Sequence, residues 1–154
     1  MAQGVKVRRA VSGDLAAVAG LFDLYRQFQK QASDPAAARA FIGERLERGE
    51  SVIFLAEDES GPLGLTQSFP SFSSVGMTRT FTLNDLYVTA EARGRGVASA
   101  LLDAAAEFAG GKGASRLMLL VATDNSPAEA LYIREGWQRE DSFFIYLLPL
   151  AKKP

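Results

Sequence analysis

The sequence predicts a mixed α/β fold in which a central sheet is flanked by helices. The period of the apolar residues changes along the chain between two residues, as in strands, and three to four residues, as in helices. A strand, a glycine-rich turn, a helix and a second strand follow one another in its second half, which is a βαβ unit. The 154 residues, of which 47% are hydrophobic and 23% charged, suit one globular domain. We therefore expect residues 1–154 to form a single domain, with residues 152–154 as a basic tail.

One strand and two helices are expected in the first third of the chain. Residues 5–8 alternate apolar and polar side chains, as a half-buried strand does. Ser12 or Asp14 can cap the helix that follows, whose apolar residues recur at three- and four-residue steps. Asp34, followed by a proline at the first helical position, predicts the start of a second helix that ends near Gly49.

Three strands are expected in the middle of the chain. Residues 51–56 and 63–69 are expected to pair as an antiparallel hairpin, because a cluster of turn-forming residues separates them. Residues 80–88 form the next strand. The serine-rich residues 70–77 are expected to be a loop that carries Phe72.

The last third is expected to alternate helices with strands. A helix begins after the glycine turn and covers residues 97–108, and the two glycines at 110–111 are expected to stop it. Residues 116–121 form a strand, and residues 126–135 form a short capped helix. The apolar residues 143–148 are expected to supply the closing strand. The predicted order is β-α-α-β-β-β-α-β-α-β.

The composition excludes several classes of chemistry. The chain has no cysteine and no histidine, so it has no disulfide framework, no thiolate nucleophile and no imidazole base or metal ligand. Acid-base chemistry must use Asp, Glu, Lys, Tyr, the backbone or water. A metal site would need carboxylate oxygens alone, and none is predicted.

The charge balance and hydropathy limit the expected partners. Seventeen basic residues stand against eighteen acidic ones, so we expect no nucleic-acid partner. No segment approaches the ~20 apolar residues that span a bilayer, and the first residues lack the apolar region of a signal peptide. We expect no membrane association and a cytoplasmic location.

The segment from Leu86 to Ala98 is the most informative part of the sequence. A strand runs into a loop with two glycines and then directly into a helix, so several backbone amides and the helix dipole converge on one point. Gly94 and Gly96 allow a close approach to phosphate oxygens, and Arg93 and Arg95 add positive charge. The loop therefore suits a pyrophosphate, although such turns also occur for geometric reasons alone, with solvated arginines.

Two nucleotide-binding motifs fit this loop poorly. The Walker motif is excluded because no Gly-Lys-Ser/Thr follows at the required spacing. The dinucleotide motif needs a third glycine, where this chain has Ser99. Its acidic partner would be Asp124, about 28 residues onward where ~20 is usual. A dinucleotide-binding Rossmann-type protein is a weak alternative.

Two motifs stand at a definite distance from each other in the second half of the chain, and further residues accompany them. The residues are Asp85-Leu86-Tyr87-Val88, Arg93-x-x-Gly96-x-Ala98, Asn125-x-x-Ala128-x-x-Leu131-Tyr132 and Gly136-Trp137. Together they resemble the motifs of the GNAT family of N-acetyltransferases, whose acetyl-CoA signature Arg93-x-x-Gly96-x-Ala98 matches. The resemblance spans roughly residues 5 to 148, and the chain as a whole resembles the small fungal-type histone and polyamine acetyltransferases and their bacterial relatives.

The resemblance implies how acetyl-CoA, the co-substrate, is bound. In the family, a mostly antiparallel central sheet splays open at the cofactor site, and the pantetheine arm pairs with the exposed strand edge. Asn125 would contact the arm, although it could equally cap the helix that follows. The implied cofactor residues are Leu86, Tyr87, Val88, Arg93, Gly94, Arg95, Gly96, Val97, Ala98 and Asn125.

The resemblance also implies the catalytic and acceptor residues. Tyr132 matches the family tyrosine that protonates the departing CoA thiolate; without the resemblance it would be a packing residue. Asp85 is the candidate for taking a proton from the amine, directly or through water, or for holding the ammonium; a buried structural Asp is the alternative. Related polyamine enzymes carry an acidic pair here, whereas this chain has Asn84 before Asp85. Tyr25, Phe69, Phe72 and Tyr87 are candidates for the acceptor walls, and each is equally well explained as core or hairpin packing.

The sequence thus predicts an acetyl-CoA-dependent N-acetyltransferase. Its acceptor is a primary amine: a small amine, a polyamine, an amino acid or a lysine side chain in a peptide. Transfer of another acyl group, or to another acceptor, stays open, as does a non-catalytic CoA-binding sensor or interaction module. A homodimer is also open, because residues 143–148 could join a neighbour's sheet or cover the chain's own core.

Overall fold

A computed structural model describes residues 4–151 of the chain. The described residues up to Leu120 form one compact unit, and those from Val121 onward form another. The expected single domain of residues 1–154 stays a prediction, and the basic tail at 152–154 lies outside the described residues.

The first unit is built on a five-stranded sheet in the order β1-β2-β3-β4-β5. The first four strands are antiparallel neighbours, and β5 lies parallel to β4. This confirms a mixed, mostly antiparallel sheet and removes the Rossmann-type alternative, which needs a doubly wound parallel sheet. The strands are β1 (Lys6–Arg9), β2 (Val52–Asp58), β3 (Gly61–Ser73), β4 (Thr78–Val88) and β5 (Ala114–Met118).

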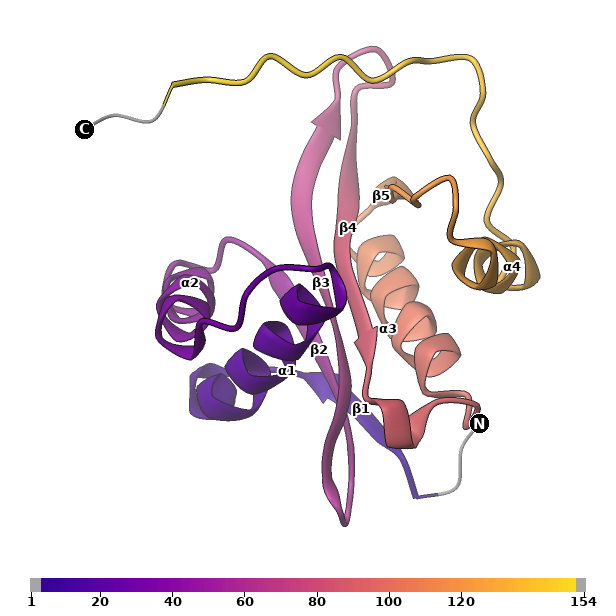
Figure 1. The fold of residues 1–154 in the computed structure, drawn as a ribbon. Helices are drawn as coiled ribbons and strands as arrows, with labels where there is room; N and C mark the ends of the chain where they lie inside the picture. The colour runs from indigo at the N-terminus through magenta and orange to yellow at the C-terminus, as the bar shows by residue number, and fades with distance from the viewer. Residues whose placement is uncertain (1–3, 152–154) are drawn as a thin grey trace. The chain divides into compact units, whose positions relative to one another are not determined.

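Helices cover both faces of this sheet (Figure 1). On one face, α1 (Leu15–Phe28) and α2 (Pro35–Arg48) bury a cluster that includes Ile53 and Leu65. On the other face, α3 (Val97–Gly111) packs Leu101 against Leu63 of β3. Two short 3-10 turns, η1 (Ser12–Asp14) and η2 (Ala90–Ala92), precede α1 and α3.

The structure confirms the predicted ends of α2 but not the predicted cap of α1. The Asp34 side chain accepts from the Ala37 amide at 3.1 Å, and Gly49 ends α2 in the left-handed conformation, so both predicted limits are confirmed. The predicted side-chain cap of α1 is wrong, because α1 has no side-chain cap hydrogen bond. The Asp14 carboxylate instead accepts from the Val11 amide at 2.8 Å and pairs with Arg8.

The hairpin of β3 and β4 is longer than expected. The loop predicted at 70–77 is confined to residues 74–77, because β3 continues to Ser73 and β4 begins at Thr78. Pro70 lies inside the strand, opposite Phe81. The pairing of β3 with β2 ends at Ser68, so the missing N–H of Pro70 falls where β3 has only one partner strand.

Two further boundaries can be compared with the predictions. The predicted stop of α3 at the glycines 110–111 is confirmed, because the helix ends at Gly111; the left-handed residue that follows its end is Gly113, with φ of 78°. The strand predicted at 116–121 is observed as β5 at Ala114–Met118, a shift toward the N-terminus. Its position is set by pairing with β4, where its parallel partners are Arg79, Phe81 and Thr82.

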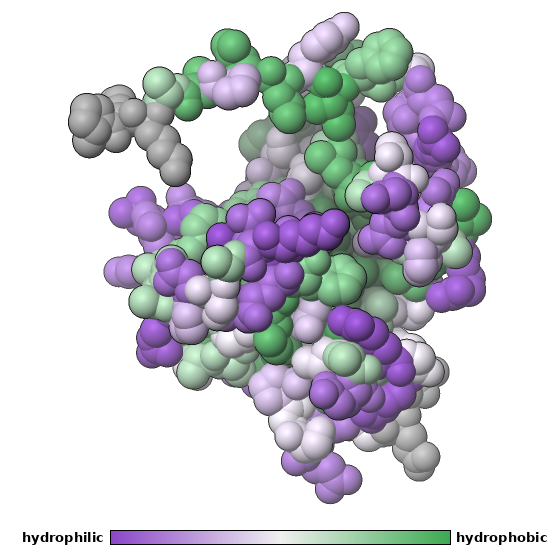
Figure 2. Space-filling model, viewed as in Figure 1, coloured by the Kyte–Doolittle hydropathy of each residue, from purple (hydrophilic) through white to green (hydrophobic). Residues whose placement is uncertain are grey.

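The second unit contains α4 (Ser126–Arg134), as predicted. The closing strand at 143–148 is wrong: the structure assigns no strand to residues 135–151. Their large apolar side chains are exposed, with Phe144 at 88% and Leu148 at 83%, and Figure 2 shows them as a largely hydrophobic run. A strand needs a hydrogen-bonded neighbour, and the described part of this unit has no other strand. No helix among the described residues is long and apolar enough to cross a membrane.

We expect Gly64→Ala to destabilise the protein. An added Cβ would lie 2.6 Å from the Tyr87 carbonyl oxygen and 3.3 Å from the Val88 Cα, so β4 would have to move. We expect a loss of about 1–3 kcal/mol in the free energy of unfolding, measured by urea denaturation. Gly20→Ala is the control: that position is in α1 with no atom within 4 Å of an added Cβ, and a gain of about 0.5–1 kcal/mol is expected. Equal effects at both glycines would contradict the close approach at Gly64.

Candidate functional site

An open strand edge forms the centre of the candidate site. The parallel pairing of β4 with β5 ends at Thr82 and Met118, whereas β4 continues to Val88 with only β3 beside it in this unit. The sheet is therefore splayed beyond Thr82. Leu86, Tyr87 and Val88, expected to pair with the pantetheine arm, lie on this stretch.

The glycine turn leads from this edge into α3. Gly94 and Gly96 both have positive φ, of 78° and 79°, a conformation that side chains resist. Gly96 is the N-cap of α3 and makes no side-chain cap hydrogen bond. The first amides of the helix, from Val97 on, have no carbonyl within the helix to pair with. An added Cβ on Gly94 would meet no atom within 4 Å, so the described residues leave space beside the turn.

Both arginines of the turn contact other parts of the first unit. The Arg95 guanidinium pairs with the Asp58 carboxylate of β2 at 3.0 Å. The Arg93 Nε donates to the Val88 carbonyl at 3.1 Å, and its guanidinium carbon lies 5.4 Å from the ring centroid of Phe28. Their charge stays near the turn, but their side chains also hold the turn to the strands beneath it.

Asp85 lies on the face of β4 that packs against α1. It is only 8% exposed; Gln67 Nε2 donates to its Oδ2 at 2.6 Å, and Tyr25 also hydrogen bonds to its side chain. Burial raises the pKa of Asp85, and the hydrogen bonds from Gln67 and Tyr25 oppose this rise. These partners are side chains, not the loop amides of the structural alternative. Asn84 beside it is exposed.

A β-bulge decides which face Asp85 occupies. Gln67 pairs with Asp85 but Ser68 pairs with Leu83, so Asn84 is an extra residue in β4. Phe81 packs with Phe108 of α3, and Tyr87, six residues later, packs with the α1 cluster. Regular alternation would put both on the same face, so the bulge reverses the faces of β4 between them.

Gln67 and Ser51 are functional candidates that the sequence analysis missed. Gln67 is fully buried, and its Oε1 accepts from the Ser51 hydroxyl at 2.8 Å. The predicted hairpin already placed Gln67 in a strand. The signal was a polar residue on an otherwise buried strand, but its contact with Asp85 depends on the register of β3 against β4, which the sequence does not supply.

The predicted acceptor walls are only partly brought together. The rings of Tyr25 and Phe28 lie 6.4 Å and 6.1 Å from the ring of Tyr87, beside Asp85 on the α1 face. Phe72 is 68% exposed near the hairpin end, where Arg79 lies over its ring. Six residues of β4 separate that position from Asp85, roughly 20 Å along a strand, so Phe72 does not join this group. Phe69 is half-buried and lies three pairs nearer to Asp85 along the hairpin than Phe72 does.

The remaining predicted residues belong to the second unit. The Asn125 side chain accepts from the Ala128 amide at 3.3 Å, so its capping role is confirmed, while its contact with the pantetheine arm stays a prediction. The Tyr132 ring packs with Trp137 at 5.7 Å between centroids. Partial burial raises the pKa of Tyr132, so its phenol keeps its proton at neutral pH.

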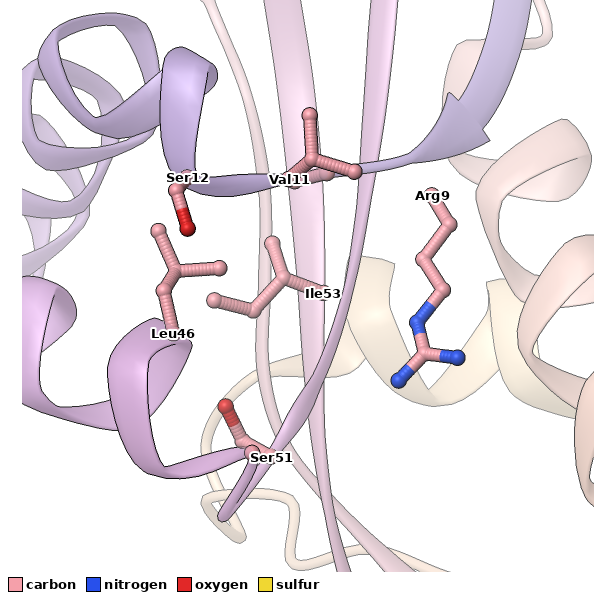
Figure 3. Close-up of a pocket in the computed structure, with 8 residues that line it drawn as sticks. Arg9, Val11, Ser12, Leu46, Ser51 and Ile53 are labelled. Atoms are coloured by element: carbon pink, nitrogen blue, oxygen red, sulfur yellow. The ribbon is translucent and has the colours of Figure 1, made fainter.

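A separate hollow of about 310 Å³ lies beside β1 and the end of α2 (Figure 3). Leu46, Ile53 and Ser51 line it, but none of the predicted site residues does. Residues 4–151 also contain no group of three or more acidic, cysteine or histidine side chains that could hold a metal ion.

Comparisons with known proteins agree with this geometry. The acetyltransferase (GNAT) family matches residues 18–137, which include the open edge, the glycine turn and Tyr132. The chain belongs to the GNAT family of acetyltransferases. The uncharacterized N-acetyltransferase YhfO of Bacillus subtilis (strain 168) is 43% identical over 97% of this chain and all of the relative.

Solved structures share the fold. A crystal structure of a probable acetyltransferase has a TM-score of 0.89 and 37% identity, covering 96% of this chain and 99% of the other. An aminoglycoside N-acetyltransferase in complex with CoA has a TM-score of 0.80 at 18% identity, covering 95% of each chain, a likeness that concerns the fold alone.

The raised pKa of Asp85 predicts how its contribution to stability depends on pH. The folded protein resists ionisation of Asp85, so its contribution falls as pH rises from the unfolded value of about 3.9 through the higher folded value. We therefore expect the stability of Asp85→Asn relative to wild type to improve as pH rises from about 4 to 8. Urea denaturation across this range measures it.

Asp58→Asn is the control with the opposite sign. Hydrogen bonds from Ser60 and Arg95 lower the pKa of Asp58, so its stabilisation is present above the unfolded pKa and lost as pH falls through the folded one. The free energy of unfolding of Asp58→Asn should therefore lie furthest below that of wild type near neutral pH. A pH-independent difference for Asp85→Asn would show that the carboxyl titrates as it does in the unfolded chain.

Proposed function

We propose that this GNAT acetyltransferase moves an acetyl group from acetyl-CoA directly to a primary amine. The observation that carries this proposal is the open edge of β4 beside a glycine turn that feeds into α3. An edge strand can pair with an extended amide-containing chain, and the start of a helix attracts a pyrophosphate. Both features lie within residues 82–98. The edge for the amide-containing arm comes first and the helix start for the pyrophosphate follows, in the same order as these two groups along the cofactor.

The residues present fit acetyl-CoA, which supplies the acetyl thioester when bound. Amides of residues 94–98 would hold its pyrophosphate, because Gly94 and Gly96 keep Cβ atoms away from the turn. The free edge from Leu86 to Val88 would hold the pantetheine amides. The family membership and the fold shared with a CoA-bound aminoglycoside N-acetyltransferase support this choice.

Asp85 is proposed to accept the proton that the ammonium group of the substrate must lose. A primary amine has a pKa near 10.4 and is almost wholly protonated at neutral pH, so it cannot attack before this step. Because Asp85 is only 8% exposed, the proton reaches the carboxylate through a bridging group, either water or the Tyr25 hydroxyl that hydrogen bonds to it.

Tyr132 is proposed to give its phenolic proton to the sulfur of the leaving thiolate. The raised pKa of Tyr132 keeps the phenol protonated until a strongly basic group is formed. No covalent bond to the protein forms, and the main contribution of the chain is to hold the two substrates within attack distance, worth on the order of 7 kcal/mol.

The test is CoA release from acetyl-CoA in the presence of spermidine, a lysine-containing peptide and free amino acids. Because the chain has no cysteine, a thiol-reactive dye reports the released CoA without a background from the protein. Amine-dependent release supports the proposal. Binding of acetyl-CoA without release by any amine would favour the alternative, a CoA-binding module that lacks turnover.

We expect Gly96→Val to weaken acetyl-CoA binding by about tenfold or more, measured by calorimetry. A branched side chain at φ of 79° strains the turn and occupies the space beside the amides. Gly113→Val is the matched control: Gly113 has φ of 78° just beyond the other end of α3. Both variants should lose stability, but only Gly96→Val should lose affinity. Full affinity in Gly96→Val would mean that the turn does not hold the pyrophosphate.

We expect Tyr132→Phe to lower kcat about 100-fold while the Kd for acetyl-CoA stays nearly unchanged, because only the proton donor is removed. The control is Tyr146→Phe, the same chemical change at a 91% exposed residue of the same unit, which should leave kcat unaltered. Steady-state kinetics with the best amine of the panel measures both. Unchanged turnover in Tyr132→Phe would exclude the phenol from the reaction.

A further inference from the structure

A line of buried polar side chains runs from Ser51, the residue before β2, across β3 and β4 to α1. The Ser51 hydroxyl donates to Gln67 Oε1 at 2.8 Å, and Gln67 Nε2 donates to Asp85 Oδ2 at 2.6 Å. Tyr25 of α1 hydrogen bonds to the same carboxyl. Ser51, Gln67 and Asp85 are 7%, 0% and 8% exposed, so bulk water does not compete for these bonds.

We propose that Gln67 is a positioning residue, whose fixed amide holds the Asp85 carboxylate in place for proton transfer. The inference rests on the proposed role of Asp85 as the proton acceptor. It adds two side chains, Gln67 and Ser51, that lie outside the signature motifs of the sequence.

The orientation of the Gln67 amide follows from Asp85. An ionised carboxylate only accepts hydrogen bonds, so the NH₂ group must face it, because a flipped amide would bring two acceptor oxygens together. The Ser51 hydroxyl then donates to the amide oxygen on the other side and holds it there. Figure 3 shows the Ser51 side chain beside the hollow at the end of α2.

The bulge at Asn84 brings the two sides of this line together. Gln67 is the last residue of β3 before the register shift, and its partner across the strands is Asp85. The shift places the Asp85 side chain on the α1 face, where Tyr25 also contacts the bulge through the Asn84 carbonyl at 3.2 Å. The bulge therefore brings Asp85 within reach of Gln67 on the neighbouring strand, and the Gln67 amide donates a hydrogen bond to the carboxylate.

The hydrogen bond has a chemical consequence for the carboxyl. Burial disfavours the ionised form, which is the form able to accept a proton. A donor from a buried amide favours that form without adding a charge of its own. Gln67 thus keeps Asp85 usable as a proton acceptor at a site where burial would otherwise keep it protonated.

The test is a titration of Asp85 by NMR in the full chain labelled with ¹³C at the aspartate carboxyl carbons, with Asp85→Asn identifying the signal. In Gln67→Leu we expect the midpoint to move to higher pH by roughly one pH unit. In Ser51→Ala, which only frees the amide, a smaller shift in the same direction is expected. Thr66→Val is the control, because Thr66 is equally buried but points to the opposite face of β3.

An unmoved midpoint in Gln67→Leu overturns the proposal. If that variant does not fold, Ser51→Ala decides alone, and an unmoved midpoint there overturns it equally. Thr66→Val shifting as far as Gln67→Leu also overturns it, because the effect would then be a general loosening of β3.

The rate of amine-dependent CoA release separates this proposal from the proposed function. With spermidine as the acceptor, the acid limb of the kcat/KM profile should move with the NMR midpoint in Gln67→Leu, while the KM for acetyl-CoA stays unchanged. A moved midpoint with an unmoved rate profile supports the contact between Gln67 and Asp85 but removes Asp85 from the reaction. No CoA release by wild type with any amine would instead count against the proposed function.

Discussion

Between Thr82 and Val88, β4 is hydrogen bonded to another strand of its unit on one side only. Backbone amides and carbonyls at a sheet edge need partners, and a strand of this length is otherwise covered or blunted in folded proteins. Here the chain turns away at Val88, and the glycine turn brings the start of α3 next to the same edge. The open edge and the helix start are therefore parts of one arrangement, and the proposed cofactor, which is extended and has an anionic end, would satisfy both.

A single extra residue decides which side chains of β4 lie on the α1 face beside that edge. Without the bulge at Asn84, Asp85 would share the face of Phe81 and pack toward α3. With it, Asp85 lies among Gln67, Tyr25 and the ring of Tyr87. Bulges cost pairing and are common next to active sites, where they redirect a side chain. The stability lost in the ladder is offset in part by the hydrogen bonds that the redirected carboxyl accepts.

Much of the first unit could be predicted from the sequence, because its signals are local. Asp34 and Gly49 mark the ends of α2, and the change of period after Gly96 marks α3. Features set by pairing could not be predicted. Pro70 favours a loop by composition, but it lies in β3 beyond the end of the β2 pairing, where the strand has only one partner and tolerates a proline. The strand expected at 143–148 is apolar enough, but a strand also needs a neighbour, which composition does not reveal.

The same distinction applies to the candidate site. The glycines of the turn were evident because positive φ is a local property, whereas Gln67 was missed because its partner is eighteen residues away in the sequence. The arginines of the turn show a further limit. Arg95 is paired with Asp58, which offsets its charge, and Arg93 donates to the Val88 carbonyl at the rim of the open edge. The proposed anion recognition at this turn would therefore depend first on backbone amides and the helix start, whose direction is fixed by the fold, and only second on the side-chain charges that the sequence displays.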